Sequence, residues 1–166
     1  MINFKRIGLL EILVSFSAIY VISTLIWTAS TRSSVEEKAN LIKSNHKQVV
    51  EFVNNQINNC DKNDNKLKTV WGDLCSDTWS SEKIINYINN NIKFKNSNFN
   101  NSKFVKSAQD PRLQAEGKAG QSTEIGVIFI SSSNFESEPG SEWIIGTCVK
   151  SPCVAAGNNE LTSVYR

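Results

Sequence analysis

The chain has 166 residues, with 18 Lys and Arg against 16 Asp and Glu and a net charge of +2. This length suffices for one modest globular domain beside a short additional segment and leaves room for little more. The near balance of charge argues against a dedicated nucleic-acid-binding domain, in which a clustered basic surface is expected. The Lys- and Asn-rich stretch 93–106 leaves nucleic acid open as a partner without supporting it, because a solvated loop explains the stretch as well.

The first predicted element is an apolar run over residues 7–27 that contains one charge, Glu11, and no proline. A helix of about 20 residues spans the ~30 Å hydrocarbon core of a bilayer, so the run predicts a membrane-spanning helix. Lys5 and Arg6 precede it, and the positive-inside rule places them in the cytoplasm and the following chain on the other side. A cleaved secretory signal is the alternative, although the run exceeds the usual h-region and no A-x-A-like site follows it.

The helical pattern continues beyond this run, because apolar residues recur at three- and four-residue steps with Lys and Glu between them. Neither Pro nor Gly occurs over residues 9–56, so we predict one helix from about Ile7 to about Asn58 with an amphipathic second half. A second helix is predicted after Ser80, its N-cap, with Glu82 in the first turn. The apolar stripe of the first helix consists of Val35, Ala39, Ile42, His46, Val49, Val50, Val53 and Ile57.

The four cysteines fall into two sequence-local pairs, Cys60 with Cys75 and Cys148 with Cys153. Neither spacing is that of a zinc knuckle, and the single histidine, His46, lies far from both pairs. An even number of cysteines after a membrane anchor favours disulfides in an oxidising compartment. Three connectivities are open, of which the local pairing Cys60–Cys75 and Cys148–Cys153 is the simplest.

The last third of the chain predicts β-structure. Residues 96–121 read as a long surface loop with one short strand at 103–105, and three strands follow at 124–131, 142–149 and 160–165. Their short links indicate an antiparallel meander whose apolar face lies on the amphipathic half of the long helix. We therefore predict an α+β fold in which a long N-terminal helix packs on a small antiparallel sheet.

Catalytic signals are missing from the sequence. It contains no G-x-S-x-G, P-loop, G-x-G-x-x-G or H-E-x-x-H motif and no base for a Ser or Cys nucleophile. His46 is expected to be a packed or edge histidine, and Trp71, Trp79 and Trp143 are expected in the core or at an interface. We predict a protein that is not an enzyme and that holds neither a metal nor a cofactor.

The N-terminal residues resemble those of the type IV pilin family, which includes the pilin-like pseudopilins. That family begins with a short basic leader and a cleavage site, followed by an apolar helix whose fifth residue is Glu. Counted from Ile7, the fifth residue of this chain is Glu11, and residues 9–14 read Leu-Leu-Glu-Ile-Leu-Val. The resemblance implies a leader at 1–6, a membrane and filament-core helix at 7–28 and a globular domain at 29–166 outside the cytoplasm.

The resemblance also implies processing by a prepilin peptidase, but the sequence departs from the family at the cleaved bond. The family normally has Gly before that bond, whereas here Arg6 precedes Ile7. Cleavage between Gly8 and Leu9 is the second register, and it would make Glu11 only the third residue. We expect cleavage between Arg6 and Ile7 with N-methylation of the new terminus, or no efficient processing.

The function that the resemblance implies is that of a structural subunit of a type IV pilus-like filament. The subunit would wait in the bacterial inner membrane and then join an extracellular pilus, and the Glu11 carboxylate would pair with the Ile7 amine of a neighbouring subunit. Its partners would be identical subunits, minor pilins, the prepilin peptidase and the inner-membrane assembly machinery. Two alternatives stay open, namely a pseudopilin or minor pilin of a type II secretion-type system and a membrane-anchored binding domain that never polymerises.

Overall fold

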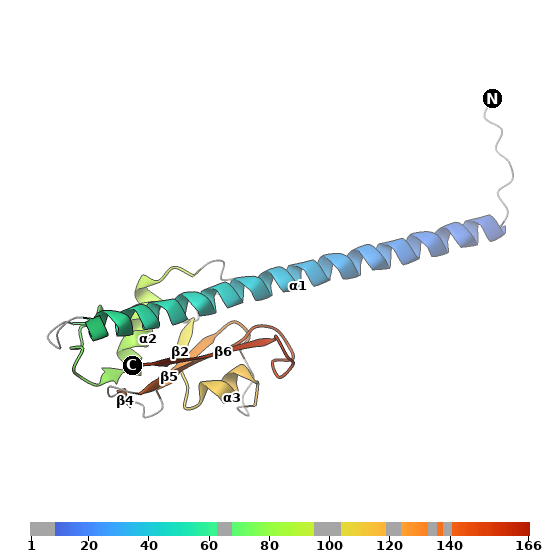
Figure 1. The fold of residues 1–166 in the computed structure, drawn as a ribbon. Helices are drawn as coiled ribbons and strands as arrows, with labels where there is room; N and C mark the ends of the chain where they lie inside the picture. The colour runs from blue at the N-terminus through green and yellow to red at the C-terminus, as the bar shows by residue number, and fades with distance from the viewer. Residues whose placement is uncertain (1–8, 63–67, 95–103, 119–123, 133–135, 138–140) are drawn as a thin grey trace. The chain divides into compact units, whose positions relative to one another are not determined.

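A computed structural model describes residues 9–62, 68–94, 104–118, 124–132, 136–137 and 141–166 (Figure 1). The chain divides into two compact units, Met1–Lys38 and Ala39–Arg166. Helix α1, Leu9–Lys62, contributes to both units, which agrees with the long helix predicted from the sequence. All other helices and strands of the described residues lie in the second unit, and together they form an α+β fold.

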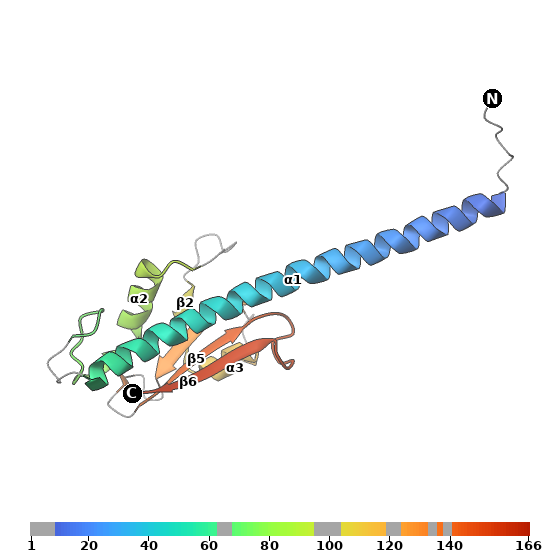
Figure 2. The same cartoon turned by 45° about the horizontal axis from the view of Figure 1, so that its top comes forward.

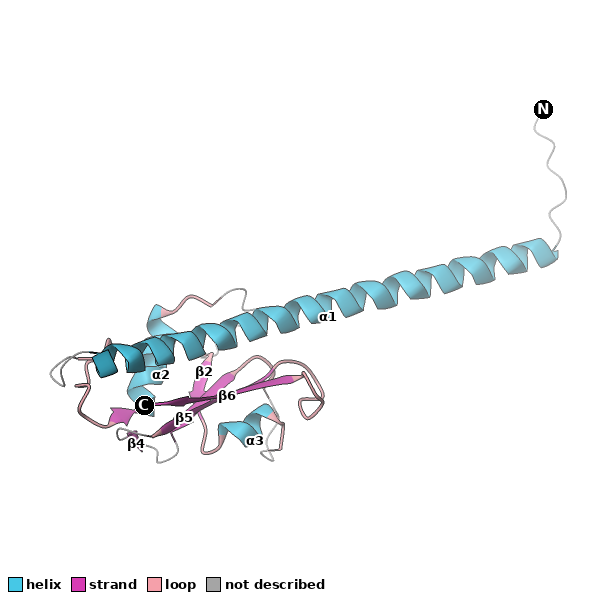
Figure 3. Cartoon of the chain, in the orientation of Figure 1, coloured by secondary structure: helices cyan, strands magenta, loops and turns pink. Residues whose placement is uncertain are grey.

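Figure 3 shows these elements by type: strands alternate with helices α2 and α3 up to α3, and the described elements after α3 are all strands. The strand predicted at 142–149 is confirmed as β5, and the strand predicted at 160–165 is confirmed as β6. The elements after α1 are β1 (Trp79–Ser80), α2 (Ser81–Asn91), β2 (Val105–Ser107), α3 (Pro111–Ala115), β3 (Ile128–Ser132), β4 (Glu136–Ser137), β5 (Glu142–Cys148) and β6 (Asn159–Tyr165).

Within Ala39–Arg166, helix α1 buries one stripe of side chains. Val49 and Val53 are 0% exposed and Ile57 is 2% exposed, and their four-residue spacing keeps them on one side of the helix. They join a core built from α2, the sheet and Trp79 of β1. The predicted amphipathic second half is confirmed from Ala39 onward, whereas Val35, the first residue of the predicted stripe, is 47% exposed. The other buried members of this core are Ile84, Ile85, Ile88, Val105, Ile128, Ile130, Trp143, Ile145 and Val164.

The main sheet has four strands in the order β2-β3-β5-β6, and it is mixed rather than antiparallel. Strands β3, β5 and β6 form the predicted antiparallel meander, but β2 runs parallel to β3, with Val105 opposite Ile128. The prediction of a purely antiparallel sheet was therefore wrong. Two parallel strands need a crossover connection between them, and the segment that the sequence predicted to be a surface loop belongs to this connection. Strands β1 and β4 form a separate antiparallel pair.

Helix α2 packs against the β2 end of the sheet. Ser80 occupies the predicted N-cap position, although its side chain makes no capping hydrogen bond. Near the end of the helix, the Asn89 amide nitrogen donates to the Val105 carbonyl at 2.8 Å. The Asn89 carbonyl oxygen accepts from the Val105 N–H at 3.0 Å. The side chain of Asn89 thus imitates a neighbouring strand and closes this edge of the sheet at Val105.

Helix α3, which the sequence analysis missed, lies on the face of the sheet opposite to α1 (Figures 1 and 2). It starts with Asp110 as N-cap and Pro111 in the first turn. Gly146 of β5 permits its close approach, because a Cβ at this position would lie 2.3 Å from the Pro111 carbonyl oxygen and 3.1 Å from the Ala115 Cβ. A glycine inside a strand often marks such a contact with another backbone.

Both disulfides join cysteines that are close in sequence, and the described residues contain no free cysteine. The Cα atoms are 5.3 Å apart in Cys60–Cys75 and 5.3 Å apart in Cys148–Cys153. The first bridge ties the last turns of α1 to the loop before β1, and the second closes the loop after β5. The simplest of the three connectivities is the one that the structure has.

Replacing Gly146 by Ala should destabilise the fold by roughly 1–3 kcal/mol, because the added methyl group collides with backbone atoms of α3 that have no room to move. Chemical denaturation followed by tryptophan fluorescence measures the change. Ser163→Thr is the matched control, since it adds one methyl group to an exposed position of the neighbouring strand β6. Equal stability of Gly146→Ala and the parent protein would contradict the close packing of α3.

Candidate functional site

The residues that the sequence analysis assigned to processing and assembly lie at the start of the chain. Arg6, Ile7 and Gly8 are outside the described residues. Leu9 and Glu11 belong to the first turn of α1, and their side chains are outside the described part of the structure. The proposed ion pair and the cleaved bond therefore stay predictions. The described site begins at Leu13.

From residue 13 to residue 38 every side chain of α1 is exposed within the structure. The first part of this segment is apolar, and α1 is long and apolar enough to cross a membrane by length and composition. Large apolar side chains in contact with water are unfavourable, each costing roughly 1.5–3 kcal/mol relative to burial. The side chains that are more than half exposed are Leu13, Val14, Phe16, Ile19, Tyr20, Val21, Ile22, Leu25, Ile26 and Trp27.

The hydroxyl groups in this segment bond to the helix itself. Ser17 donates to the Val14 carbonyl at 2.8 Å, Ser23 to the Ile19 carbonyl at 2.7 Å, and Thr24 to the Val21 carbonyl at 2.8 Å. Such bonds to the preceding turn satisfy the hydroxyl proton without water. A membrane interior or an apolar helix bundle requires that kind of internal pairing. These residues were not among the predicted site residues, although Ser and Thr inside a helix commonly form such bonds.

His46 is the polar residue in the predicted apolar stripe of α1. It is 4% exposed, and its Nδ1 lies 2.9 Å from the Thr147 hydroxyl. Its Nε2 lies 3.1 Å from the Thr162 hydroxyl. The expectation of a packed histidine is confirmed. Both ring nitrogens are engaged by side chains of the sheet, so the ring is held between α1, β5 and β6.

The three tryptophans expected in the core or at an interface pack in or against the core. Trp79 and Trp143 are each 0% exposed, whereas Trp71 is partly buried against the same core. The rings of Trp71 and Trp79 meet edge to face with centroids 5.0 Å apart. Arg166 lies over Trp79, with its guanidinium carbon 4.0 Å from the ring centroid, and no sequence signal pointed to this contact.

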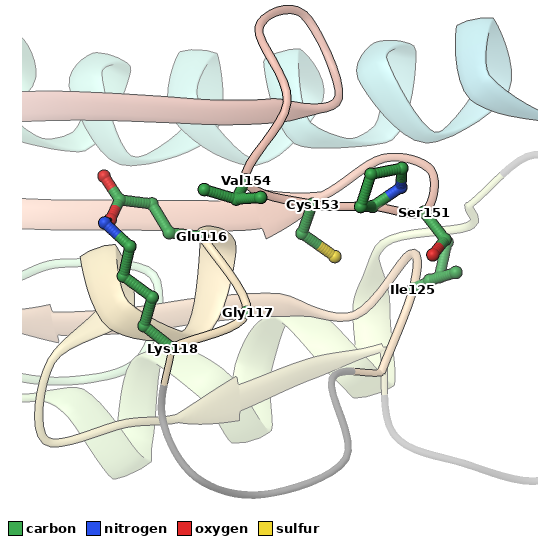
Figure 4. A pocket seen from close by; sticks show the side chains of 8 residues that line it. Glu116, Gly117, Lys118, Ile125, Ser151, Cys153 and Val154 are labelled. Atoms are coloured by element: carbon green, nitrogen blue, oxygen red, sulfur yellow. The ribbon is translucent and has the colours of Figure 1, made fainter.

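A shallow hollow of about 500 Å³ lies between the end of α3 and the loop closed by Cys148–Cys153 (Figure 4). Its two charged side chains pair with each other, because the Lys118 nitrogen is 2.7 Å from the Glu116 carboxylate. The remaining lining is mostly apolar and small. It is lined by Glu116, Gly117, Lys118, Ile125, Ser151, Pro152, Cys153 and Val154.

On the same side of the sheet as α3, Glu142 of β5 gathers several polar side chains. Its carboxylate accepts two hydrogen bonds from Arg112, at 3.1 and 3.2 Å. A hydrogen bond from Ser163 and then the positive charge of Arg112 hold the pKa of the Glu142 carboxyl below its usual range. This cluster is a surface ion pair that helps to hold α3 against β5, since Arg112 belongs to that helix.

Across the described part of the chain, no three His, Cys, Asp or Glu side chains come together as a set that could hold a metal ion. Comparison of the chain with protein-family models, with curated proteins and with solved structures finds no match. The site with the clearest physical consequence is therefore the exposed apolar segment of α1 over residues 13–27.

Removing the segment should change how the protein behaves in water. We expect residues 39–166, produced with both disulfides, to be soluble and monomeric without detergent, because this unit has its own core. The full chain should sediment with membranes and require detergent for extraction. Membrane fractionation and size-exclusion chromatography make the comparison. A full chain that stays monomeric and soluble without detergent would show that the exposed segment needs neither lipid nor a partner.

Proposed function

We propose that the protein is a structural subunit of a type IV pilus-like filament that assembles through its apolar N-terminal helix. The observation that carries the proposal is the exposure of the apolar side chains over residues 13–27 on a helix that also anchors a separate folded unit. A surface of this kind has to be covered, either by lipid or by other apolar helices. A pilin needs both environments in turn, since it waits in the membrane and is then transferred to a filament core.

The membrane stage accounts for the orientation of the subunit. Lys5 and Arg6 keep the N-terminus in the cytoplasm, and the unit Ala39–Arg166 lies on the outer side. Two disulfides in that unit fit an oxidising compartment. The bacterial inner membrane with the periplasm beyond it meets both conditions, and an extracellular pilus is the final location.

The filament stage accounts for Glu11. A carboxylate within an apolar segment costs roughly 2–3 kcal/mol or more, and that cost falls when a cation pairs with it. Cleavage between Arg6 and Ile7 would create an amine four residues away along the chain, and stacked neighbouring helices would bring the amine of one subunit to the acid of the next. Apolar contacts would supply most of the association, and the ion pair would select one axial register.

The same features are compatible with two alternative functions. A pseudopilin or minor pilin of a type II secretion-type system would use the same helix and the same acid. A membrane-anchored binding domain that never polymerises is favoured by Arg6, because this residue stands where the family has Gly. Minor pilins, the peptidase and the assembly machinery are proposed partners in the first two cases only.

Fibres sheared from the cell surface separate these alternatives. Under the proposal, the intact mass and N-terminal sequence of the protein in such fibres correspond to a chain that starts at the N-methylated Ile7. A start at Leu9 would move the cleaved bond to the second register. Recovery of the chain only from membranes, with Met1 still present, would favour the anchored binding domain over the filament subunit.

Substitution of Glu11 tests the ion pair directly. Glu11→Gln and Glu11→Val should both reduce the yield of filaments at least tenfold while membrane insertion stays intact, because the register-selecting charge is lost but the apolar surface is kept. Electron microscopy and immunoblotting of sheared fractions measure the yield. The matched control is Glu37→Gln on the exposed polar part of the same helix, which should assemble normally. Filaments at parent yield in both Glu11 variants would remove the role proposed for this acid.

A further inference from the structure

The single histidine of the chain lies where α1 meets the sheet, and its surroundings are uncharged at contact distance. His46 faces Thr147 on β5 and Thr162 on β6, and each threonine hydroxyl is within hydrogen-bond distance of one ring nitrogen. A neutral imidazole fits this arrangement, because one nitrogen donates and the other accepts while each hydroxyl rotates to suit. The ring is therefore satisfied without a charge.

The charged groups near the ring come from α1 and β6. Lys43 lies one turn before His46 on α1, and its nitrogen is 3.0 Å from the carboxylate of Glu160 on β6. Glu160 acts on His46 through its charge, but it already has Lys43 as its ion-pair partner. Strand β5 contributes the uncharged Thr147 to the same place. Among the described residues, the acid whose charge acts on the ring is Glu160, and Lys43 pairs with that acid.

These surroundings make a protonated ring unfavourable. Burial lowers the pKa of His46 from 6.5 to about 4, and the charge of Glu160 offsets only part of that effect. A buried cation at this position would require both threonine hydroxyls to accept at once, and it would lose its hydration. The folded protein therefore binds a proton at this residue more weakly than the unfolded chain does.

We infer that His46 is an acid-sensitive latch between helix α1 and strands β5 and β6, closed while the ring is neutral and released when the ring takes up a proton. Release loosens the contact between α1 and the sheet at the position that precedes the buried residues Val49, Val53 and Ile57 on the same side of the helix. The latch acts on the unit Ala39–Arg166 and does not depend on filament assembly.

The sign of the pH effect follows from proton binding. The folded-state pKa is the lower one, so the stabilisation by the neutral ring is fully present above pH 6.5 and is lost as the pH falls towards 4. Over that interval the equilibrium constant for closing the latch should fall by about two orders of magnitude. Carboxylates also titrate near the lower limit, and a variant without histidine is needed to separate their contribution.

The experiment uses the full chain in detergent micelles. NMR of the single imidazole should give a pKa well below 6.5, and amide exchange in residues 45–57 of α1, divided by the intrinsic exchange rate at each pH, should accelerate between pH 6.5 and pH 4. In His46→Gln, which keeps a polar side chain that does not titrate, the acceleration over this interval should shrink at least tenfold. Thr147→Val serves as a second variant, because it removes one hydroxyl partner and keeps the titratable ring.

Two results would overturn the inference. An imidazole that titrates near 6.5 in the folded parent protein would mean that the ring is not held neutral by its surroundings. Equal acceleration of exchange in the parent protein and in His46→Gln would mean that other groups open the helix. If His46→Gln does not fold, Thr147→Val supplies the comparison: the pKa of the ring should shift and the pH at which exchange accelerates should shift with it. Exchange that keeps its pH dependence while the titration of the ring moves would then overturn the inference.

Discussion

The packing of α1 against the inner face of the mixed sheet is the contact on which the folded unit depends. Val49 and Val53 are completely buried there, and strands β3, β5 and β6 supply the opposing side chains. Burial of this kind stabilises a domain in proportion to the apolar area removed from water. Because α1 is one continuous helix over Leu9–Lys62, the same element that completes the core also carries the apolar side chains of residues 13–27, which no other described residue buries.

Local signals in the sequence were sufficient for the elements that interact with their neighbours along the chain. The spacing of Val49, Val53 and Ile57 predicts the buried side of a helix before any partner is known. The paired cysteines join because short loops bring them together, and β5 and β6 follow from β-branched and aromatic runs between turns. For these elements, propensity and tertiary structure agree.

Non-local contacts account for what the sequence left undetermined. Strand β2 is three residues long, and its parallel pairing with β3 has no signature in either segment. The Asp110-Pro111 pair was a usable signal for the start of α3, but a helix of five residues is too short to show periodicity. The reason for a glycine at position 146 becomes clear only when the position of α3 is known. Ile7 and the side chain of Glu11, the expected assembly site, lie outside the part of the chain that the structure describes.

The pairing of Asn89 with the backbone of Val105 affects whether copies of this domain can aggregate through the edge of the sheet. A bare outer strand recruits strands from adjacent molecules and can seed cross-β deposits. Here a side-chain amide occupies the donor and acceptor that an intruding strand would use, and β2 offers little length beyond them. On this side of the domain, neighbouring molecules can come into contact without pairing their strands.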